Sequence, residues 1–178
     1  MLRTMRHPGV ETEGLQRLVG LLPLGGSVVE VGCYAGESAR LWLARAKKYI
    51  GVDPWVDYKD VADGTDASEH EMRAAEAAFD VVLAQFAGKG LKYKMKSLAA
   101  ADLLMWCKLD AIYLDGLHDY RNVVADLRAW GPLVRAGGML CGHDHNRNGF
   151  QEVVAAVRDE LGGPDEVFAD TSWMKLVP

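Results

Sequence analysis

The chain has few of the features that mark secreted, membrane-spanning or nucleic-acid-binding proteins. Its 178 residues include three cysteines, an odd number without metal or disulfide spacing. No apolar run reaches the roughly 20 residues that a bilayer-spanning helix needs. The first ten residues lack the apolar segment of a signal peptide. The net charge of -5 provides no basic field for nucleic acid or anionic lipid. We therefore expect a cytoplasmic protein that binds neither nucleic acid nor a membrane.

Strand and helix patterns alternate along the chain, without repeats or low-complexity segments. The predicted strands are 27–31, 49–53, 91–96, 110–115, 137–143, 166–170 and 173–177, and the predicted helices are 11–22, 36–46, 72–86, 100–106, 120–130 and 150–161. A Gly137-Gly138 turn is expected to open the fifth strand. This alternation predicts an α/β fold, with residues 1–178 forming one doubly wound domain behind an N-terminal helical segment, residues 1–26. Its sheet of seven strands is mostly parallel, and the two closing strands pair antiparallel.

The loop after the first predicted strand identifies the cofactor. A dinucleotide site has the pattern G-x-G-x-x-G, in which a side chain at the second glycine would block the pyrophosphate. Here three residues separate Gly32 from Gly36, and Tyr34 stands at the second glycine position. Glu30 adds a negative charge beside the loop, which disfavours a pyrophosphate and favours a cationic ligand. The loop therefore predicts S-adenosylmethionine rather than NAD.

Four further residues near this loop have two interpretations each. Asp53 follows the second strand and suits a bidentate hydrogen bond to ribose hydroxyls, although an Asp before Pro also starts turns. Ser38 fits a helix N-terminal turn as well as a ligand contact. Trp55 either stacks on adenine or covers the edge of the site. Cys33 is better explained as a small apolar filler than as a nucleophile, since no charged partner lowers its pKa.

The carboxyl ends of the predicted strands bring acids and histidines to one edge of the sheet. Parallel strands end at the same edge, which is where ligands of doubly wound folds bind. The residues at this edge, which we call the rim, include Glu30, Asp53, Asp115, His118, His143, Asp144 and His145. Random surface placement would scatter them, so we interpret the rim as an active site.

Two acids at the rim suggest a cation site. Asp115 and Asp144 end neighbouring strands, which lie about 4.8 Å apart in a sheet. His145 follows immediately as a third candidate ligand. Oxygen ligands favour Mg²⁺ or Ca²⁺, and an added imidazole shifts the preference towards Mn²⁺, Fe²⁺ or Zn²⁺. The alternative is an Asp pair held apart by backbone hydrogen bonds, with His145 in solvent.

Two histidines are candidates for acid–base chemistry. His118 lies three residues past Asp115 at the start of the next helix, and neutral imidazole is available at pH 7 to accept a hydroxyl proton. A capping role for His118 is the alternative. His143 precedes Asp144 and either supports the site from behind or replaces His118 as the base.

With these residues in place, the sequence resembles the class I S-adenosylmethionine-dependent methyltransferases. It is most similar to small-molecule O-methyltransferases with the signature DGxHxY. The matching segments are "VVEVGCYAGESA", "IGVDPW", "KSLAAADLL", "AIYLDGLHDYRNVVADLRAWGPLVRAGGMLCGHDH" and "SWMKLV". Together they extend from residue 27 to the end of the chain. The resemblance implies a Rossmann-like fold.

The resemblance also implies roles for individual residues. Glu30, Gly32 and Gly36 would shape the methionine pocket, and Ser97 would mark the adenine edge, where Lys96 replaces the acid of related chains. The expected cofactor site comprises Glu30, Gly32, Cys33, Tyr34, Gly36, Ser38, Asp53, Pro54, Trp55, Ser97 and Asp115. Metal-dependent relatives such as catechol O-methyltransferase place an Asp-Asn pair after the fifth strand. Asp144 matches that Asp, whereas His145 departs from the Asn.

Together these observations predict methyl transfer from S-adenosylmethionine to a hydroxyl of a small molecule, assisted by Mg²⁺ or Mn²⁺. A metal-independent methyltransferase with a histidine base is the first alternative, and a nicotinamide-dependent oxidoreductase is a weaker one. Methylation of nucleic acid is disfavoured because an N-P-P-Y-like segment is missing from the sequence. The N-terminal part is short for the resemblance, so a homo-oligomer is expected if another subunit completes the acceptor pocket.

Overall fold

The computed structural model describes residues 10–59, 66–146 and 149–178 and contains the predicted seven-stranded sheet. The strand order is β5-β2-β1-β6-β7-β9-β8. The strands are β1 Ser27–Val31, β2 Lys48–Val52, β5 Gly90–Tyr93, β6 Leu109–Leu114, β7 Val134–Gly142, β8 Glu166–Val167 and β9 Trp173–Leu176. The first five strands in this order pair in parallel, while β9 runs antiparallel to both of its neighbours. The predicted Rossmann-like architecture and its closing hairpin are confirmed.

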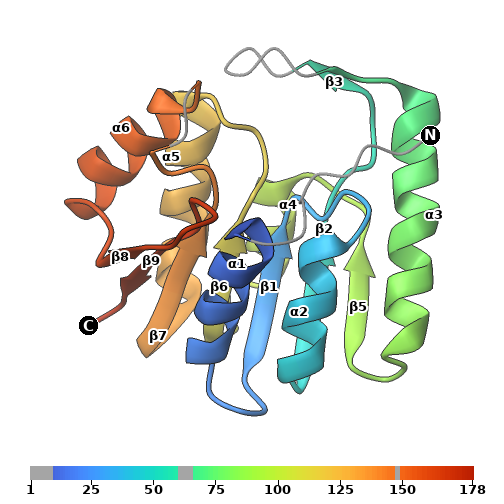
Figure 1. Cartoon of the computed structure of the whole chain (residues 1–178), viewed down its shortest axis with the longest axis horizontal. Helices are drawn as coiled ribbons and strands as arrows, with labels where there is room; N and C mark the ends of the chain where they lie inside the picture. The colour runs from blue at the N-terminus through green and yellow to red at the C-terminus, as the bar shows by residue number, and fades with distance from the viewer. Residues whose placement is uncertain (1–9, 60–65, 147–148) are drawn as a thin grey trace.

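Helices cover both faces of the sheet, giving three layers (Figure 1). One face packs against α1 Val10–Leu21, α2 Glu37–Arg45 and α3 Glu69–Gln85, and the other against α4 Ser97–Leu103, α5 Tyr120–Trp130 and α6 Gln151–Leu161. A 3-10 turn, η1 Gly131–Leu133, leads from α5 into β7. The apolar positions that predict α3 are buried in the first core, including Met72 and Phe79. Helical periodicity thus locates the faces that pack on the sheet.

Two local predictions differ from the structure. Between the predicted strand 49–53 and the predicted helix 72–86, where neither a strand nor a helix was expected, lies a two-stranded ribbon in which β3 Tyr58–Lys59 pairs antiparallel with β4 Asp66–Ala67. The Gly137-Gly138 pair lies inside β7 rather than in a turn before it. A Cβ at residue 138 would stand 2.9 Å from the Asp110 carbonyl oxygen, so glycine is needed where β7 approaches β6 and their register shifts.

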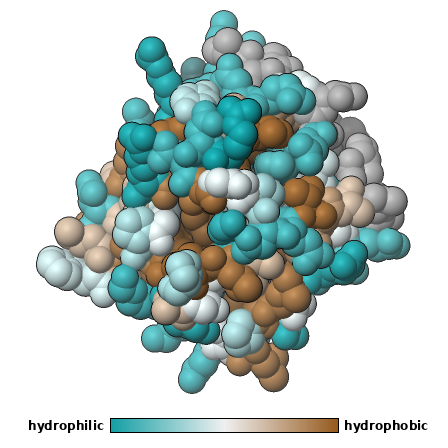
Figure 2. Space-filling model, turned by 90° about the vertical axis from the view of Figure 1, so that its left-hand side faces the viewer, coloured by the Kyte–Doolittle hydropathy of each residue, from teal (hydrophilic) through white to brown (hydrophobic). Residues whose placement is uncertain are grey.

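Other sequence expectations concern the surface and the termini. Within the described residues, no helix has the length and apolar character to span a membrane. The three cysteines are free thiols. On the face formed by α6 and the β8–β9 hairpin, hydrophilic side chains alternate with smaller hydrophobic areas (Figure 2). Residues 1–9 of the predicted N-terminal segment, and with them most of the segment tested for a signal peptide, lie outside the described residues.

Candidate active site

The glycine loop after β1 contacts the loop after β6 closely. Gly32 has a φ of 84°, and a Cβ on it would stand 1.9 Å from the carbonyl oxygen of Asp115. Any side chain would therefore force the two loops apart. Gly36, with a φ of 83°, is the N-cap residue of α2. The two glycines fix the loop directly beside the end of β6, as a shared site requires.

Asp53 follows β2 and binds the glycine loop. Its carboxylate accepts hydrogen bonds from the backbone N–H groups of Tyr34, at 3.0 Å, and Trp55, at 2.8 Å. Asp53 is 6% exposed, and burial raises its pKa although these amide hydrogen bonds oppose the rise. Pro54 lies between Asp53 and Trp55 in the resulting turn. This position agrees with both interpretations of Asp53, because the residue starts a turn and also stands next to the predicted cofactor loop.

Trp55 packs into the protein core in this structure. Its side chain is 2% exposed, and its indole N–H donates to the Tyr34 carbonyl oxygen at 2.9 Å. The ring packs against Phe79 with 5.1 Å between ring centroids. The Tyr34 hydroxyl in turn donates to Glu71 of α3 at 2.7 Å. This position of Trp55 agrees with the interpretation that it covers the edge of the site. Stacking on adenine would require the ring to move.

Glu30 is fully buried, with hydrogen-bond partners from its own chain. The hydroxyl groups of Ser38 and Tyr49 both donate to its carboxylate. Ser38 thus lies in the first turn of α2, whose N-cap is Gly36, and its hydroxyl binds Glu30. Cys33 lies beside them, and burial, followed by the charges of Glu30 and Asp53, raises its thiol pKa well above the ordinary value. Such a thiol stays protonated, which agrees with a filler role and not with a nucleophile.

Ser97, the predicted adenine-edge residue, is the first residue of α4. Its hydroxyl donates to the Asp126 carboxylate at 2.5 Å and accepts the Trp130 indole N–H at 2.8 Å. Burial raises the pKa of Asp126 to about 6, against the effect of the Ser97 hydrogen bond. Sequence reasoning missed Asp126, because an acid inside an amphipathic helix resembles an ordinary surface position.

The other side of the rim gathers three candidate ligands from different loops. Three side chains each place one donor atom within 4.8 Å of the others: Asp115, His118 and Asp144. Among the described residues, this is the group that could hold a metal ion. His118 Nε2 stands 3.1 Å from an Asp144 carboxylate oxygen. The His118 ring also packs edge-on against Phe150, at the start of α6. The predicted convergence of strand ends is confirmed for these side chains.

Asp144 is ionised in this arrangement. Burial of its carboxyl disfavours the charge, but hydrogen bonds from His118 and His143 outweigh burial and lower its pKa far below the usual range. His143 lies behind it, with Nδ1 3.2 Å from Asp144 and 3.6 Å from Asp115. His143 Nε2 is 2.7 Å from the backbone carbonyl oxygen of Asp170, so this nitrogen is protonated and donates, while Nδ1 faces the two carboxylates. Of the two interpretations of His143, this position fits the one in which it holds the acids in place rather than acting as the base.

His145, the third predicted ligand, lies outside this group of three. Asp144 adopts a φ of 61°, and this left-handed turn separates the directions of consecutive side chains. The His145 backbone N–H donates to Thr171, while its Nδ1 is buried with no partner among the described residues. Burial lowers the pKa of His145. His118, predicted as a base, occupies the third position instead.

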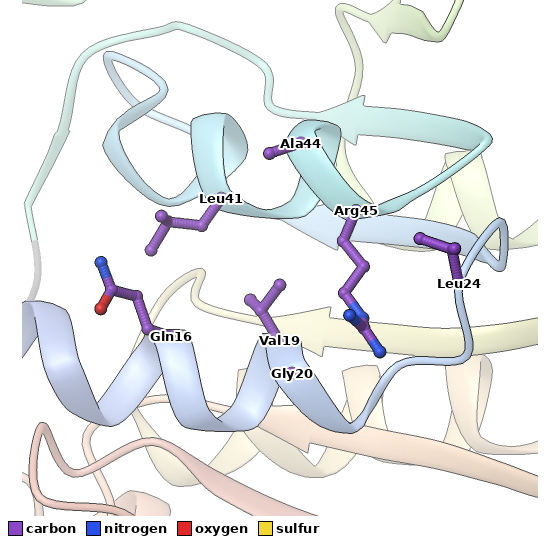
Figure 3. A pocket seen from close by; sticks show the side chains of 7 residues that line it. All are labelled: Gln16, Val19, Gly20, Leu24, Leu41, Ala44 and Arg45. Atoms are coloured by element: carbon purple, nitrogen blue, oxygen red, sulfur yellow. The ribbon is translucent and has the colours of Figure 1, made fainter.

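Two cavities are lined by described residues, and the larger one has no rim residue in its wall. A hollow of about 300 Å³ lies between α1 and α2, where Val19, Leu24, Leu41 and Arg45 line it together with Gln16, Gly20 and Ala44 (Figure 3). Its lining contains no acid or histidine. A smaller cavity of about 20 Å³ lies directly beneath the rim and includes His118 and His143 in its wall. The chemistry of the rim, and not the size of the hollows, locates the site.

Comparisons with known proteins identify the family. A profile of methyltransferase domains matches residues 29–145, which include the glycine loop and all members of the rim. The chain is a member of this methyltransferase family. No match is found among curated proteins. The methyltransferase is therefore S-adenosylmethionine-dependent and Rossmann-like, and the cofactor loop predicted from Gly32 to Gly36 lies within the matched region.

Solved structures share the fold at low sequence identity. The O-methyltransferase from Bacillus cereus in complex with SAH has a TM-score of 0.64 and 16% identity, covering 97% of this chain and 83% of its own. Cofactor-bound Rv0187 from MTB has a TM-score of 0.66 and 14% identity, with coverage of 98% and 83%. The O-methyltransferase NovP has a TM-score of 0.59 and 16% identity, with coverage of 95% and 80%. At these identities the comparisons establish the fold.

Proposed function

We propose that this methyltransferase moves a methyl group from S-adenosylmethionine to a hydroxyl of a small molecule, with a divalent metal ion at the rim. The observation that carries this proposal is the grouping of Asp115, His118 and Asp144 beside the cofactor loop. Structural neighbours include O-methyltransferases, one of them with SAH bound, which supports the same chemistry. The net charge of -5 favours a small acceptor over nucleic acid.

The donor set suits a hard or borderline cation. Two carboxylates suit Mg²⁺ or Mn²⁺, the imidazole shifts the preference towards Mn²⁺, and Asp144 is already held in its ionised form. These three residues would hold the ion, which when bound lowers the pKa of a coordinated hydroxyl. The sulfonium methyl group is already activated, so the chain's own residues have to orient the acceptor oxygen in line with it.

A metal-independent mechanism is the second candidate. It is favoured by the 3.1 Å contact between His118 Nε2 and the Asp144 carboxylate, a pairing that orients an imidazole as a general base. In this version His118 accepts the hydroxyl proton and Asp144 stabilises the imidazolium. The fold and the cofactor are the same in both versions, and only the requirement for an ion differs.

Methyl transfer from radiolabelled S-adenosylmethionine to catechols, phenols and sugars tests the proposal. We expect transfer that EDTA abolishes and that Mn²⁺ or Mg²⁺ restores. Activity that survives EDTA but is lost in His118→Ala would favour the metal-independent version. Asp102→Asn removes an exposed acid on α4, away from the rim. It controls for the loss of an acid and is expected to retain full activity. Absence of transfer to every hydroxyl acceptor would contradict both versions.

A further inference from the structure

The small cavity beneath the rim has one acid in its wall, Asp126, that methyl transfer itself does not use. Its volume of about 20 Å³ is enough for one water molecule. Asp126, His118 and His143 contribute polar groups to its wall, and Trp173 of β9 closes another side. A space of this size can hold a water molecule where several polar groups of its wall can bind it.

Asp126 is the most unusual group of this wall. It is a carboxyl group with 8% exposure, on the inner face of α5. One oxygen accepts the Ser97 hydroxyl at 2.5 Å, and the other lies 3.8 Å from the Cβ position of residue 116 at the end of β6. A buried carboxylate requires several donors, since burial removes its hydration. The cavity is the place from which water can supply another.

Trp173 adds an independent observation. Its side chain is 1% exposed, and its indole N–H has no hydrogen-bond partner within the described part of the chain. Buried donors almost always find an acceptor in proteins, often an ordered water molecule. A single water in the cavity can accept from Trp173 and donate to Asp126, so one molecule satisfies both groups.

We propose that the cavity holds an ordered water molecule, and that this water and Asp126 form the outlet for the proton released during methyl transfer. This inference rests on the proposed function. As the acceptor oxygen bonds to the methyl carbon, the carbon–sulfur bond breaks and its electron pair stays on sulfur. The acceptor's O–H proton passes from the rim to the cavity water, which gives one of its own protons to the Asp126 carboxylate. Asp126 then releases that proton to solvent.

The surroundings of Asp126 set the pH at which the outlet works. Ser97 of α4 donates to it, Asp119 at the start of α5 adds a negative charge, and His118 and His143 face the cavity. Burial raises the pKa of Asp126 to about 6. Only the carboxylate can accept a proton, so the outlet is open above this pH and closes as the pH falls through it. Turnover is therefore expected to decline below about pH 6.

Asp126→Asn tests the outlet, because Asn keeps the size and the Ser97 contact but cannot take up a proton. We expect kcat at pH 8 to fall roughly 10-fold with unchanged KM and thermal midpoint, and the decline below pH 6 to disappear. Asp119→Asn is the matched control on the same helix. It keeps the helix cap and removes the neighbouring charge, so the decline moves to lower pH while the maximal rate is retained. Wild-type rate and pH profile in Asp126→Asn would overturn the proposal.

A second measurement uses the wild-type protein and does not depend on turnover. A high-resolution crystal structure is expected to show one water molecule between Asp126 and the Trp173 indole N–H. A dry cavity overturns the outlet whatever the activity of the variants. If the wild type methylates no hydroxyl while the water is present, the proposed function is what fails, and the outlet fails with it as a step of that reaction.

Discussion

The two sides of the rim use their carboxylates in opposite ways. On the cofactor side, made of Glu30, Cys33, Tyr34, Asp53 and Trp55, the acids bind hydroxyl and amide groups of nearby loops, helices and strands. On the acid–histidine side, made of Asp115, His118, His143 and Asp144, acids from two strand ends converge with imidazoles around one point. The first arrangement fixes the shape of a loop. The second arrangement concentrates negative charge at one point, as a site that binds a cation or transfers a proton requires.

Asp144→Asn is expected to have the largest effect and to confine it to the acid–histidine side. Loss of one ionised ligand weakens Mn²⁺ binding and lowers kcat roughly 100- to 1000-fold, as expected for losing several kcal/mol of stabilisation. SAH affinity stays unchanged, because the cofactor side is intact. Calorimetry with Mn²⁺ and with SAH, together with the methyl-transfer rate, measures all three. A loss of SAH affinity equal to the loss of Mn²⁺ affinity would show that the two sides are not separate.

Asp53→Asn makes the converse change. We expect SAH to bind about 10- to 100-fold more weakly, since the acceptor that we propose for the ribose hydroxyls loses its charge. The free energy of unfolding also falls by about 1–3 kcal/mol, because the amide group cannot accept from both Tyr34 and Trp55. Mn²⁺ affinity is expected to be retained. Calorimetry measures the SAH affinity, and urea unfolding measures the stability. Unchanged SAH binding would show that Asp53 supports the loop but does not bind the cofactor.

Acid titration of stability distinguishes the same two sides in the metal-free protein. The folded-state pKa of Asp144 lies below its ordinary value of about 4, so its stabilisation is present above that pH and is lost as the pH falls through it. The wild type should therefore lose about 1 kcal/mol more than Asp144→Asn between pH 6 and pH 3. Urea unfolding at each pH measures this difference. Parallel curves for the two proteins would contradict the ionised state assigned to Asp144.

His145→Asn is expected to have the smallest effect. His145 is outside the group of three ligands, so Mn²⁺ affinity and kcat should stay within about 2-fold of wild type. Its buried Nδ1 has no partner among the described residues, and its removal is not expected to reduce stability. The same calorimetric and kinetic assays apply. A loss as large as that of Asp144→Asn would restore His145 as a ligand.

The fold could be predicted almost completely from the sequence, because period and turn residues act locally. The rim was also predictable, since parallel strands end at one edge. What sequence reasoning missed is long-range pairing: Tyr49 to Glu30, Asp126 to Ser97, and Asp170 to His143. Each joins segments whose contact depends on packing, which no spacing reveals.

The position of His145 outside the group of three has a different reason. Adjacency to Asp144 suggested a shared direction, but the left-handed backbone at Asp144 turns the chain between the two side chains. An Asp at such a position is uncommon, and a pattern of residue types gives little sign of it. The same turn leaves Asp144 facing His118, which the spacing from Asp115 had suggested for another role.

Anomalous scattering from crystals soaked with Mn²⁺ and SAH tests the central claim most directly, because it locates the ion and the cofactor together. We predict one manganese peak bonded to Asp115, His118 and Asp144 at about 2.0–2.3 Å, with SAH beside the glycine loop. SAH in place with no manganese at these three residues, or with manganese bonded to His145, would contradict the account.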